Sequence, residues 1–483
     1  MRCMAPSCLC PAGLIGLAAV LSATGCSSDE ASTDTSSTVP GMSIDVRPSE
    51  SNPLARYLDI RLDRPGTVQL ALQSSSGLVF TRDSLDEARE HTVPVVGLLA
   101  DELHTITVNA SFLTGESGES DLQIQTDTLA FPELDFEVLV PMEEDGTITI
   151  FGVDLSHETD LEAKYIGINR AGEVVWANQV DGTARGAHFL EATPDGLWID
   201  YERTGNDDGI RAYQVVNDAG DKVSEYKTPF ELFPDGEVLP NGNLVFLYHK
   251  KQKVEIPDYG EVDLIGDALA EITTTGEIVW RWDPFDHLDT SRFVAGPGQI
   301  SEGDWTHSNS VDYLEDTDEL IVSLRNQNQV IAIDRSSGEV NRIFGEDGDY
   351  TLTEGTWFKG QHHATLEPNG VLTVFDNHYE YNVETTSRVV QYQTDDTTMT
   401  MKQIWVHEFD HFYRSAGEAT VLPDGGLRIS AGGGNREEGA PLQVLELDAD
   451  RDLLWHVLVP DEHLPVFFQT SQITPNVLLS SAR

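Results

Sequence analysis

Histidine side chains recur at comparable places along the second half of the sequence. Three of them stand just before short apolar stretches that are typical of strands, namely His188, His307 and His362. Other polar side chains follow the next strand, and these are His249, Arg325 and Asn377. One histidine in such a position is usually a capping or core residue, but the repeated register indicates a shared site.

These residue types favour chemistry on an anion. Three imidazoles could bind zinc, but Arg325 ends the hairpin that carries His307 and Asn309, and a guanidinium would repel a metal ion. An imidazole can instead act as a nucleophile, with a second imidazole as general acid and base. Arginine and amide donors would hold the oxygens of a transferred sulfuryl or phosphoryl group. The residues alone therefore indicate an anion site that either binds or transfers its ligand, and we expect no metal and no cofactor.

Two kinds of hairpin turn alternate along the part of the chain that carries these residues. The first turns on Pro-Asp-Gly or Pro-Asn-Gly, at 194–196, 240–242, 368–370 and 423–425. The second turns on Gly-Glu and leads into a β-branched run, at 172–175, 276–279 and 338–340. Each pair supplies four strands, and a period of roughly 50 to 60 residues is typical of a β-propeller with one sheet per blade. We count six blades, one of them completed jointly by the last hairpin (467–481) and the first (163–177).

The repeat also predicts where the polar residues lie. If the Pro-Asn-Gly turn joins the first and second strands of a blade at one rim, the start of the first strand and the end of the second lie at the opposite rim. The imidazoles and Arg325 would then reach one mouth of the central channel, where propellers typically place their sites.

The beginning of the chain is typical of an export signal. Arg2 precedes an apolar run through Leu21, and Ala23-Thr24-Gly25-Cys26 resembles a bacterial lipoprotein cleavage site. An ordinary signal peptide with an incidental cysteine is the alternative. All four cysteines lie at or before Cys26, so we expect no disulfide and no thiolate site in the mature protein. We expect an exported protein, periplasmic or at the cell surface, that is lipid-anchored at Cys26.

The sequence predicts four regions and an all-β fold. Residues 1–26 form the lipoprotein-type signal peptide, and the Ser/Thr/Asp-rich residues 27–41 form a disordered tether. Short alternating stretches between turn residues predict a small β-sandwich over 42–135. A six-bladed β-propeller, the catalytic domain, would occupy 136–483.

The formal net charge of −52 bears on possible partners. Such a surface repels nucleic acid and acidic membranes, so we expect no nucleic-acid partner and membrane contact only through the lipid anchor. The acidic residues are spread along the chain, which is typical of adaptation to salty water.

Two segments resemble those of the bacterial arylsulfotransferases. The stretch Asp304-Trp305-Thr306-His307-Ser308-Asn309-Ser310, with Ser323-Leu324-Arg325 after it, resembles the His-x-Asn segment of that family. Gln361-His362-His363-Ala364, with Phe375-Asp376-Asn377 after it, resembles the family's Gln-His segment. The resemblance implies a six-bladed propeller, preceded in some members by a β-sandwich. It also implies sulfate transfer from a phenolic ester to a phenol, without a nucleotide donor, by a ping-pong route through a sulfurylated histidine.

The same resemblance implies roles for individual residues and small aromatic sulfate esters and phenols as ligands. His362 would be the nucleophile, with His363 as its rival. Arg325 and Asn309 would bind sulfuryl oxygens, and His307 would assist as acid and base or as an oxygen donor. His188 would be a further histidine of the site. Candidates for substrate contacts are His249, His363, Asn377 and Trp305, and aromatic side chains that could stack on an aryl ring are Trp305, Trp357, Phe358 and Tyr379.

Other functions are compatible with parts of the sequence. A non-catalytic, surface-anchored propeller that binds ligands would explain the fold and the tether but not the repeated histidines. A quinone-dependent dehydrogenase is suggested by Thr275-Gly276-Glu277-Ile278-Val279-Trp280, which resembles the tryptophan-docking repeats of those propellers. A hydrolase would result if water replaced the phenol acceptor.

Overall fold

The structure is a computed structural model of the 483-residue chain. It describes residues 37–74, 77–83, 86–129, 134–152, 163–179, 190–202, 211–227, 230, 232–257, 260–292, 303–379, 385–432, 439–459 and 470–473.

A seven-stranded sheet forms the N-terminal domain. Its strands are β1 (Ser37–Val39), β2 (Met42–Pro48), β3 (Arg56–Ser74), β4 (Gly77–Asp83), β5 (Ala88–Val95), β6 (Leu103–Phe112) and β7 (Ser117–Gln125). The first half of β3 pairs with β2 and β5, and its second half pairs with β4 and β6. Gly66 stands where the partners change, because a Cβ there would lie only 2.7 Å from the carbonyl oxygen of Ser111. Alternate side chains of both halves enclose one apolar core, as in the predicted β-sandwich.

Strand β1 corrects part of the predicted tether. Residues 37–39 pair with 42–44 around a turn at Gly41, whose φ of 89° suits glycine. These residues therefore belong to the sandwich. The rest of the predicted tether and the signal peptide with Cys26 lie outside the described residues.

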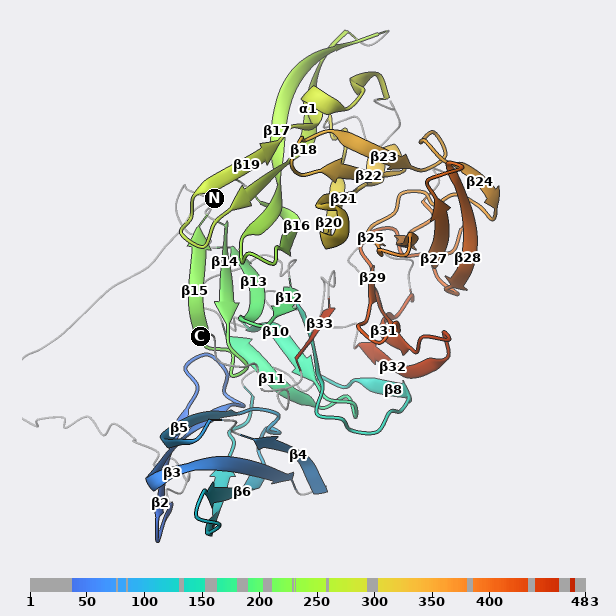
Figure 1. The fold of residues 1–483 in the computed structure, drawn as a ribbon. Coiled ribbons are helices and arrows are strands. Elements are labelled where there is room, and N and C mark those ends of the chain that lie inside the picture. Colours follow the sequence, from blue (N-terminus) through green and yellow to red (C-terminus); the bar gives the residue numbers. More distant parts are fainter. Residues whose placement is uncertain are drawn as a thin grey trace, which may run out of the picture. The chain divides into compact units, whose positions relative to one another are not determined.

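Six further sheets of four or five strands carry the rest of the described chain (Figure 1). The first three consist of β33 (Thr470–Ile473), β9 (Ile148–Gly152), β10 (Ala163–Ile168) and β11 (Val174–Gln179); β12 (Leu190–Thr193), β13 (Gly196–Glu202), β14 (Arg211–Val216) and β15 (Lys222–Lys227); and β16 (Leu232–Val238), β17 (Leu244–Ile256), β18 (Gly260–Ile272) and β19 (Ile278–Trp282). The other three consist of β20 (Ser308–Leu314), β21 (Glu319–Leu324), β22 (Gln329–Asp334) and β23 (Val340–Phe344); β25 (Ala364–Leu366), β26 (Val371–Asp376), β27 (Arg388–Asp395), β28 (Thr400–Glu408) and β24 (Thr351–Glu354); and β29 (Glu418–Val421), β30 (Leu427–Ala431), β31 (Leu442–Leu447), β32 (Leu453–Val459) and β8 (Glu137–Val140).

The sheets are arranged around an axis. Their first strands contact one another in the order β33, β12, β16, β20, β25 and β29, and the backbone N–H of Thr470 in β33 donates to Glu418 in β29. Figure 1 shows these strands around the centre, with the later strands of each sheet outside them. The all-β prediction of a propeller after a small sandwich is confirmed, and the number of described sheets equals the six blades that the repeat predicts.

Local chemistry explains the blades. The glycines of the Pro-Asn-Gly turns at Gly242 and Gly370 have φ of 78° and 81°, a conformation that side chains disfavour. Strands β21, β26 and β31 are buried along their whole length because a neighbouring sheet covers each of their faces, whereas outer strands such as β23 alternate.

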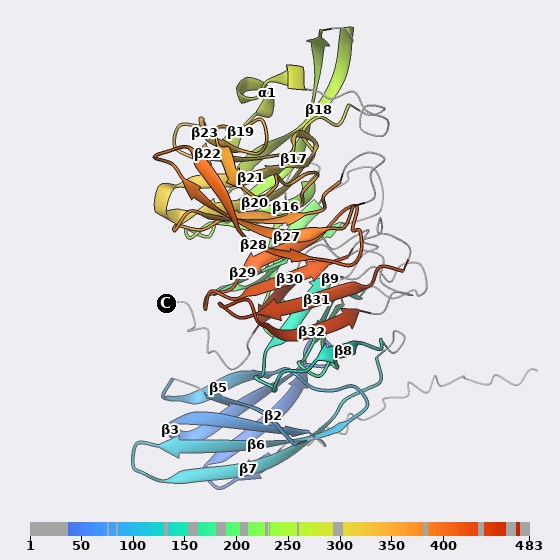
Figure 2. The ribbon, with the colours of Figure 1, turned by 90° about the vertical axis from the view of Figure 1, so that its right-hand side faces the viewer.

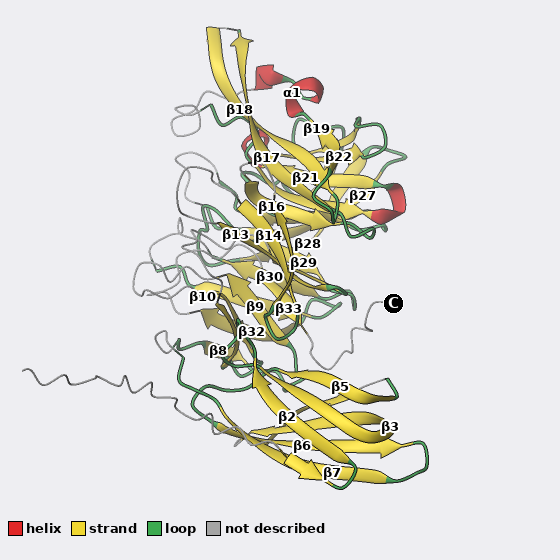
Figure 3. Cartoon of the chain, turned by 90° about the vertical axis from the view of Figure 1, so that its left-hand side faces the viewer, coloured by secondary structure: helices red, strands yellow, loops and turns green. Residues whose placement is uncertain are grey.

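Helix is scarce in the described chain (Figures 2 and 3). The structure has the single-turn α1 (Pro284–His287) and the 3₁₀ turns η1 (Thr290–Arg292), η2 (Glu315–Thr317) and η3 (Arg325–Gln327). Across the described residues, no helix has both the length and the apolar character that membrane crossing requires.

The ring closes by a single C-terminal strand, which corrects the prediction of a closing hairpin. Strand β33 pairs with β9, a strand that the repeat did not reveal, so three strands of this blade come from the beginning of the domain. Residues 474–483 lie outside the described residues.

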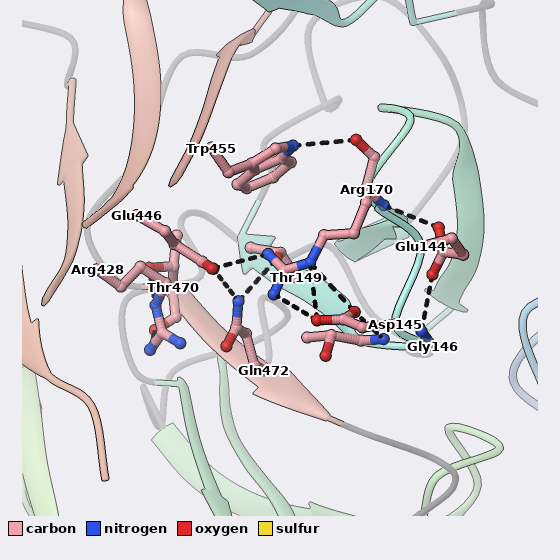
Figure 4. A network of polar contacts seen from close by, with 11 residues as sticks. Glu144, Asp145, Gly146, Thr149, Arg170, Arg428, Glu446, Trp455, Thr470 and Gln472 are labelled. Atoms are coloured by element: carbon pink, nitrogen blue, oxygen red, sulfur yellow. Dashed lines mark hydrogen bonds and ion pairs between the residues drawn. The ribbon is translucent and has the colours of Figure 1, made fainter. Parts of the chain in front are cut away.

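Side chains reinforce this closure (Figure 4). Arg170 donates to Glu446 of β31 at 2.9 Å and to Asp145 at 3.1 Å. Arg428 of β30 donates to the carbonyl oxygen of Thr470 in β33 at 2.7 Å. Because Arg170 and Glu446 are only 5% and 4% exposed, the beginning and the end of the domain are joined by a buried ion pair.

Candidate active site

His362 lies immediately before β25 and is 4% exposed. Its Nδ1 is 2.6 Å from Oδ1 of Asn377. The amide nitrogen of Asn377 donates to the carbonyl oxygens of Tyr413 and Ala416, at 2.8 and 2.9 Å, so its oxygen must face the imidazole. His362 therefore carries its hydrogen on Nδ1, and the lone pair of the neutral ring is on Nε2.

The surroundings keep this imidazole neutral. Burial, the positive charge of Arg325 and that of His307 together place the pKa of His362 well below its usual value, although the hydrogen bond with Asn377 acts the other way. At neutral pH, Nε2 of His362 is then available as a nucleophile rather than protonated.

His307 lies before β20 on the blade that precedes that of His362. Its φ of 46° is unusual for a residue with a side chain, and its Nδ1 is 2.5 Å from Oδ2 of Asp304. Burial would raise the pKa of Asp304, but the hydrogen bond and charge of His307, with the charges of His249 and Arg325, lower it below its usual value. Asp304 thus remains a carboxylate, which orients His307 with its Nε2 as the second proton-exchanging atom.

Arg325 begins η3, and its backbone N–H donates to the carbonyl oxygen of His307 at 3.2 Å. Its guanidinium carbon lies 5.4 Å from the ring centroid of Tyr379, and that of Arg414 lies 5.3 Å from the same centroid. Burial lowers the pKa of Arg325, and so does Arg414, while Asp304 and Tyr379 raise it. The charge of Arg325 acts on both His362 and Asp304, so the guanidinium stands between the nucleophile and the proton-transfer pair.

A buried carboxylate fixes the loop that carries His307. Asp267 of β18 accepts from Nδ1 of His249 at 2.8 Å, from the hydroxyl of Thr306 at 2.7 Å and from the backbone N–H of Ser308 at 2.6 Å. The side chain of Asp267 is fully buried. One residue therefore positions His249 and both neighbours of His307.

Asn309 and Gln361 join the two motifs. The amide nitrogen of Asn309 donates to the carbonyl oxygen of Gln361 at 2.9 Å, and that of Gln361 donates to Gln329 and Ser323. One amide hydrogen of Asn309 is thereby engaged and the second remains for an anion.

The sequence profile of the arylsulfotransferase (ASST) family matches residues 122–446, and that of the arylsulfotransferase Ig-like domain matches residues 43–128. The chain belongs to the arylsulfotransferase family. Membership supports aryl sulfotransferase activity in general, with aryl sulfates and phenols as substrates. No protein with a curated description matches this arylsulfotransferase.

Several solved structures are similar to parts of this arylsulfotransferase. A putative 6-phosphogluconolactonase from Bacteroides uniformis is 9% identical with a TM-score of 0.39, over 68% of this chain and 99% of that one. A functionally unknown protein from Desulfotomaculum acetoxidans is 11% identical with a TM-score of 0.38, over 75% and 94% of the two chains. A putative glucose dehydrogenase from Thermus thermophilus is 15% identical with a TM-score of 0.34, over 68% and 100%. Similarities this low carry no conclusion about function.

The structure brings together most of the residues that the sequence of this arylsulfotransferase singled out. His362, Asn377, Arg325, His307 and His249 are linked by the contacts and charges described above. His188 lies outside the described residues.

His363 faces the other way from His362. It lines a cavity of about 450 Å³ among the first strands of the blades, together with Asp312, Glu191 and Glu237. Adjacent residues of an extended segment point to opposite sides, so only one of the two histidines can meet Asn377.

Two predicted substrate contacts are wrong. Asn377 is fully buried, and its amide is engaged by His362, Tyr413 and Ala416, so it positions the imidazole and does not touch a substrate. Trp305 is 1% exposed and packs in an apolar cluster with Ile256 and Leu264, so it cannot stack on a bound ring.

Sequence reasoning missed three residues of this arrangement. Asp304 stands inside the quoted motif, and its spacing of three from His307 was the available signal. Asp267 lies opposite His249 in the hairpin of β17 and β18, which the register of that hairpin could have revealed. Arg414 comes from the segment between β28 and β29, and nothing in the sequence near it indicated a role.

Proposed function

We propose that this arylsulfotransferase moves a sulfuryl group from a phenolic sulfate ester to a second phenol in two steps through His362. In the first step, Nε2 of His362 attacks sulfur, the N–S bond forms and the bond between sulfur and the aryl oxygen breaks. His307, protonated beside Asp304, gives its Nε2 proton to the departing phenolate and becomes neutral.

The second step reverses the first with a different phenol. The acceptor hydroxyl gives its proton to Nε2 of His307, its oxygen attacks sulfur, and the N–S bond breaks, which restores His362. Arg325 and the second amide hydrogen of Asn309 stabilise the sulfuryl oxygens in both steps, since charge stabilisation and positioning dominate such loose transition states.

The contact between His362 and Asn377 carries this proposal. A buried imidazole with its hydrogen held on Nδ1 by Asn377 and its pKa lowered beside Arg325 has the electronic state that a nucleophile needs. A propeller that only bound ligands would have no need of this tautomer.

The proposal can be tested with 4-nitrophenyl sulfate, with and without added phenol. We expect nitrophenol release that rises with phenol, and a mass increase of one sulfuryl group on the peptide that contains His362. His362→Ala should lower turnover by roughly a thousandfold or more, whereas His363→Ala, at the neighbouring position on the channel side, should retain most of it. Wild-type protein that releases no nitrophenol from several aryl sulfates would favour the binding propeller instead.

We also propose that the protein is exported and lipid-anchored through Cys26, because Ala23-Thr24-Gly25-Cys26 follows an apolar run. Mass spectrometry of the N-terminal peptide should find a diacylglyceryl group on Cys26, and Cys26→Ser should release the protein from membranes. An unmodified Cys26 would reject the anchor.

A further inference from the structure

Arg414 is a cation without a carboxylate partner within the described part of the chain. Its Nη2 donates to the hydroxyl of Tyr379 at 3.4 Å, and its guanidinium lies over that ring. The chain has 82 Asp and Glu residues against 30 Lys and Arg, and the buried or half-buried arginines at blade junctions are paired with carboxylates, namely Arg170, Arg335, Arg342 and Arg388. In so acidic a protein, an arginine without such a partner indicates that its counterion comes from outside.

A second guanidinium stands close to the first. Arg325 lies over the same Tyr379 ring, at 5.4 Å from the centroid against 5.3 Å for Arg414. The two like charges repel each other, which is visible in the lowering of the pKa of Arg325 by Arg414. An anionic ligand that reaches both groups would relieve this repulsion.

The two arginines differ in exposure. Arg325 is half-buried beside His362 and His307, where the sulfuryl group must lie, whereas Arg414 is exposed to solvent. The sum of their distances to one centroid limits their separation, and the two ends of a para-substituted phenyl ring fit within that limit.

We propose that Arg414 binds a second anionic group on the aryl ring of the substrate, so that this enzyme prefers phenolic sulfates that carry a carboxylate or another negative substituent. This inference rests on the proposed function, because Arg325 and His362 define where the first anionic group lies. Tyr379 holds both guanidiniums by its ring and, for Arg414, by its hydroxyl. A local cation is needed because the net charge of −52 disfavours approach of a dianion.

Equilibrium binding of aryl sulfonates tests this without any reaction, since their carbon–sulfur bond cannot be transferred. The probes are benzenesulfonate and 4-sulfobenzoate, which differ only in the carboxylate. Wild-type protein should bind 4-sulfobenzoate more tightly, and Arg414→Gln should weaken that binding by about tenfold more than it weakens binding of benzenesulfonate. Arg414→Lys should restore only part of the difference, because an ammonium lacks the planar pair of donors.

Two controls separate the causes. Lys402→Gln on outer strand β28 changes the net charge equally and should leave the ratio of the two affinities unchanged. Arg325→Gln should weaken both probes. Equal weakening of both probes by Arg414→Gln, or no weakening of either, would overturn the inference while leaving sulfuryl transfer standing. Wild-type protein that binds neither probe and does not turn over 4-nitrophenyl sulfate would overturn the proposed function as well.

Discussion

At the scale of single residues, the reactivity of His362 is set by partners that never touch the substrate. Asn377 decides which nitrogen carries the hydrogen, and Tyr413 and Ala416 decide how Asn377 is oriented. Asp304 does the same for His307 through a carboxylate. The two histidines are therefore held in different states, one neutral and buried, the other beside a negative charge, which suits a nucleophile and a proton carrier.

The lowered pKa of His362 predicts the acid side of the pH profile. Because only the neutral ring attacks, the rate of nitrophenol release in the first turnover should stay constant as pH falls past the usual imidazole value of 6.5 and decline only well below it. Arg325→Gln removes one cause of the lowering, so the decline should move to higher pH, though burial should keep it below 6.5. A decline that does not move in Arg325→Gln would show that another group limits the rate.

At the scale of structural elements, β17 and β18 form the support on which the site is built. Their hairpin places Asp267 opposite His249, and Asp267 also binds Thr306 and Ser308 before β20. The loop of His307 thus belongs to one blade but is fixed by its neighbour. A change in one blade should therefore alter chemistry in the next.

Asp267→Asn tests this support. The amide would place hydrogens against the N–H of Ser308 or the ring of His249, so we expect a loss of about 2–3 kcal/mol in the free energy of unfolding. Displacement of His307 should lower kcat by roughly tenfold to a hundredfold. Asp263→Asn, on the same strand but 78% exposed, should change stability by less than about 0.5 kcal/mol. Urea unfolding and turnover measure both effects, and equal results for the two variants would contradict the role of Asp267.

At the scale of the whole molecule, the ring is closed by one strand and one buried cluster. Strand β33 pairs with β9, while Arg170 binds Asp145 and Glu446 across the same junction (Figure 4). Blades that meet in a ring stabilise one another, so the junction between the two ends of the domain is its least local contact.

Arg170→Met leaves Glu446 buried without its cation, and we expect it to lower the free energy of unfolding by about 3–5 kcal/mol. Arg47→Met, at the exposed ion pair with Asp59 in the N-terminal domain, should cost no more than about 1 kcal/mol. Chemical denaturation of both variants provides the comparison. Similar midpoints would mean that the closure does not depend on Arg170.

Loss of β33 should be more damaging than loss of Arg170. A chain that ends before Thr470 leaves the edge of β9 unpaired and removes the partners of Arg428 and Glu418. We expect this chain to unfold at a lower denaturant concentration than Arg170→Met and to lose turnover. Retention of both would show that three strands suffice for this blade.

Local patterns in the sequence were enough to predict the class of fold. Pro-Asn-Gly turns and Gly-Glu turns depend on the conformation of a few adjacent residues, so their alternation predicted sheets around an axis, and the sandwich followed from alternating stretches. The motifs around His307 and His362 predicted the family because each lies within a short segment. Strand β9 was missed because its partner, β33, is more than 300 residues away in the chain.

The sequence by itself thus determined the propeller, the family and the set of polar residues that enter the site. The tertiary structure decided which of His362 and His363 meets Asn377, that Trp305 is in the core, and that Arg414 joins Arg325 at Tyr379. The reason is physical: a side chain's direction, burial and charge partners depend on segments from other blades, and no pattern of neighbouring residues contains that information.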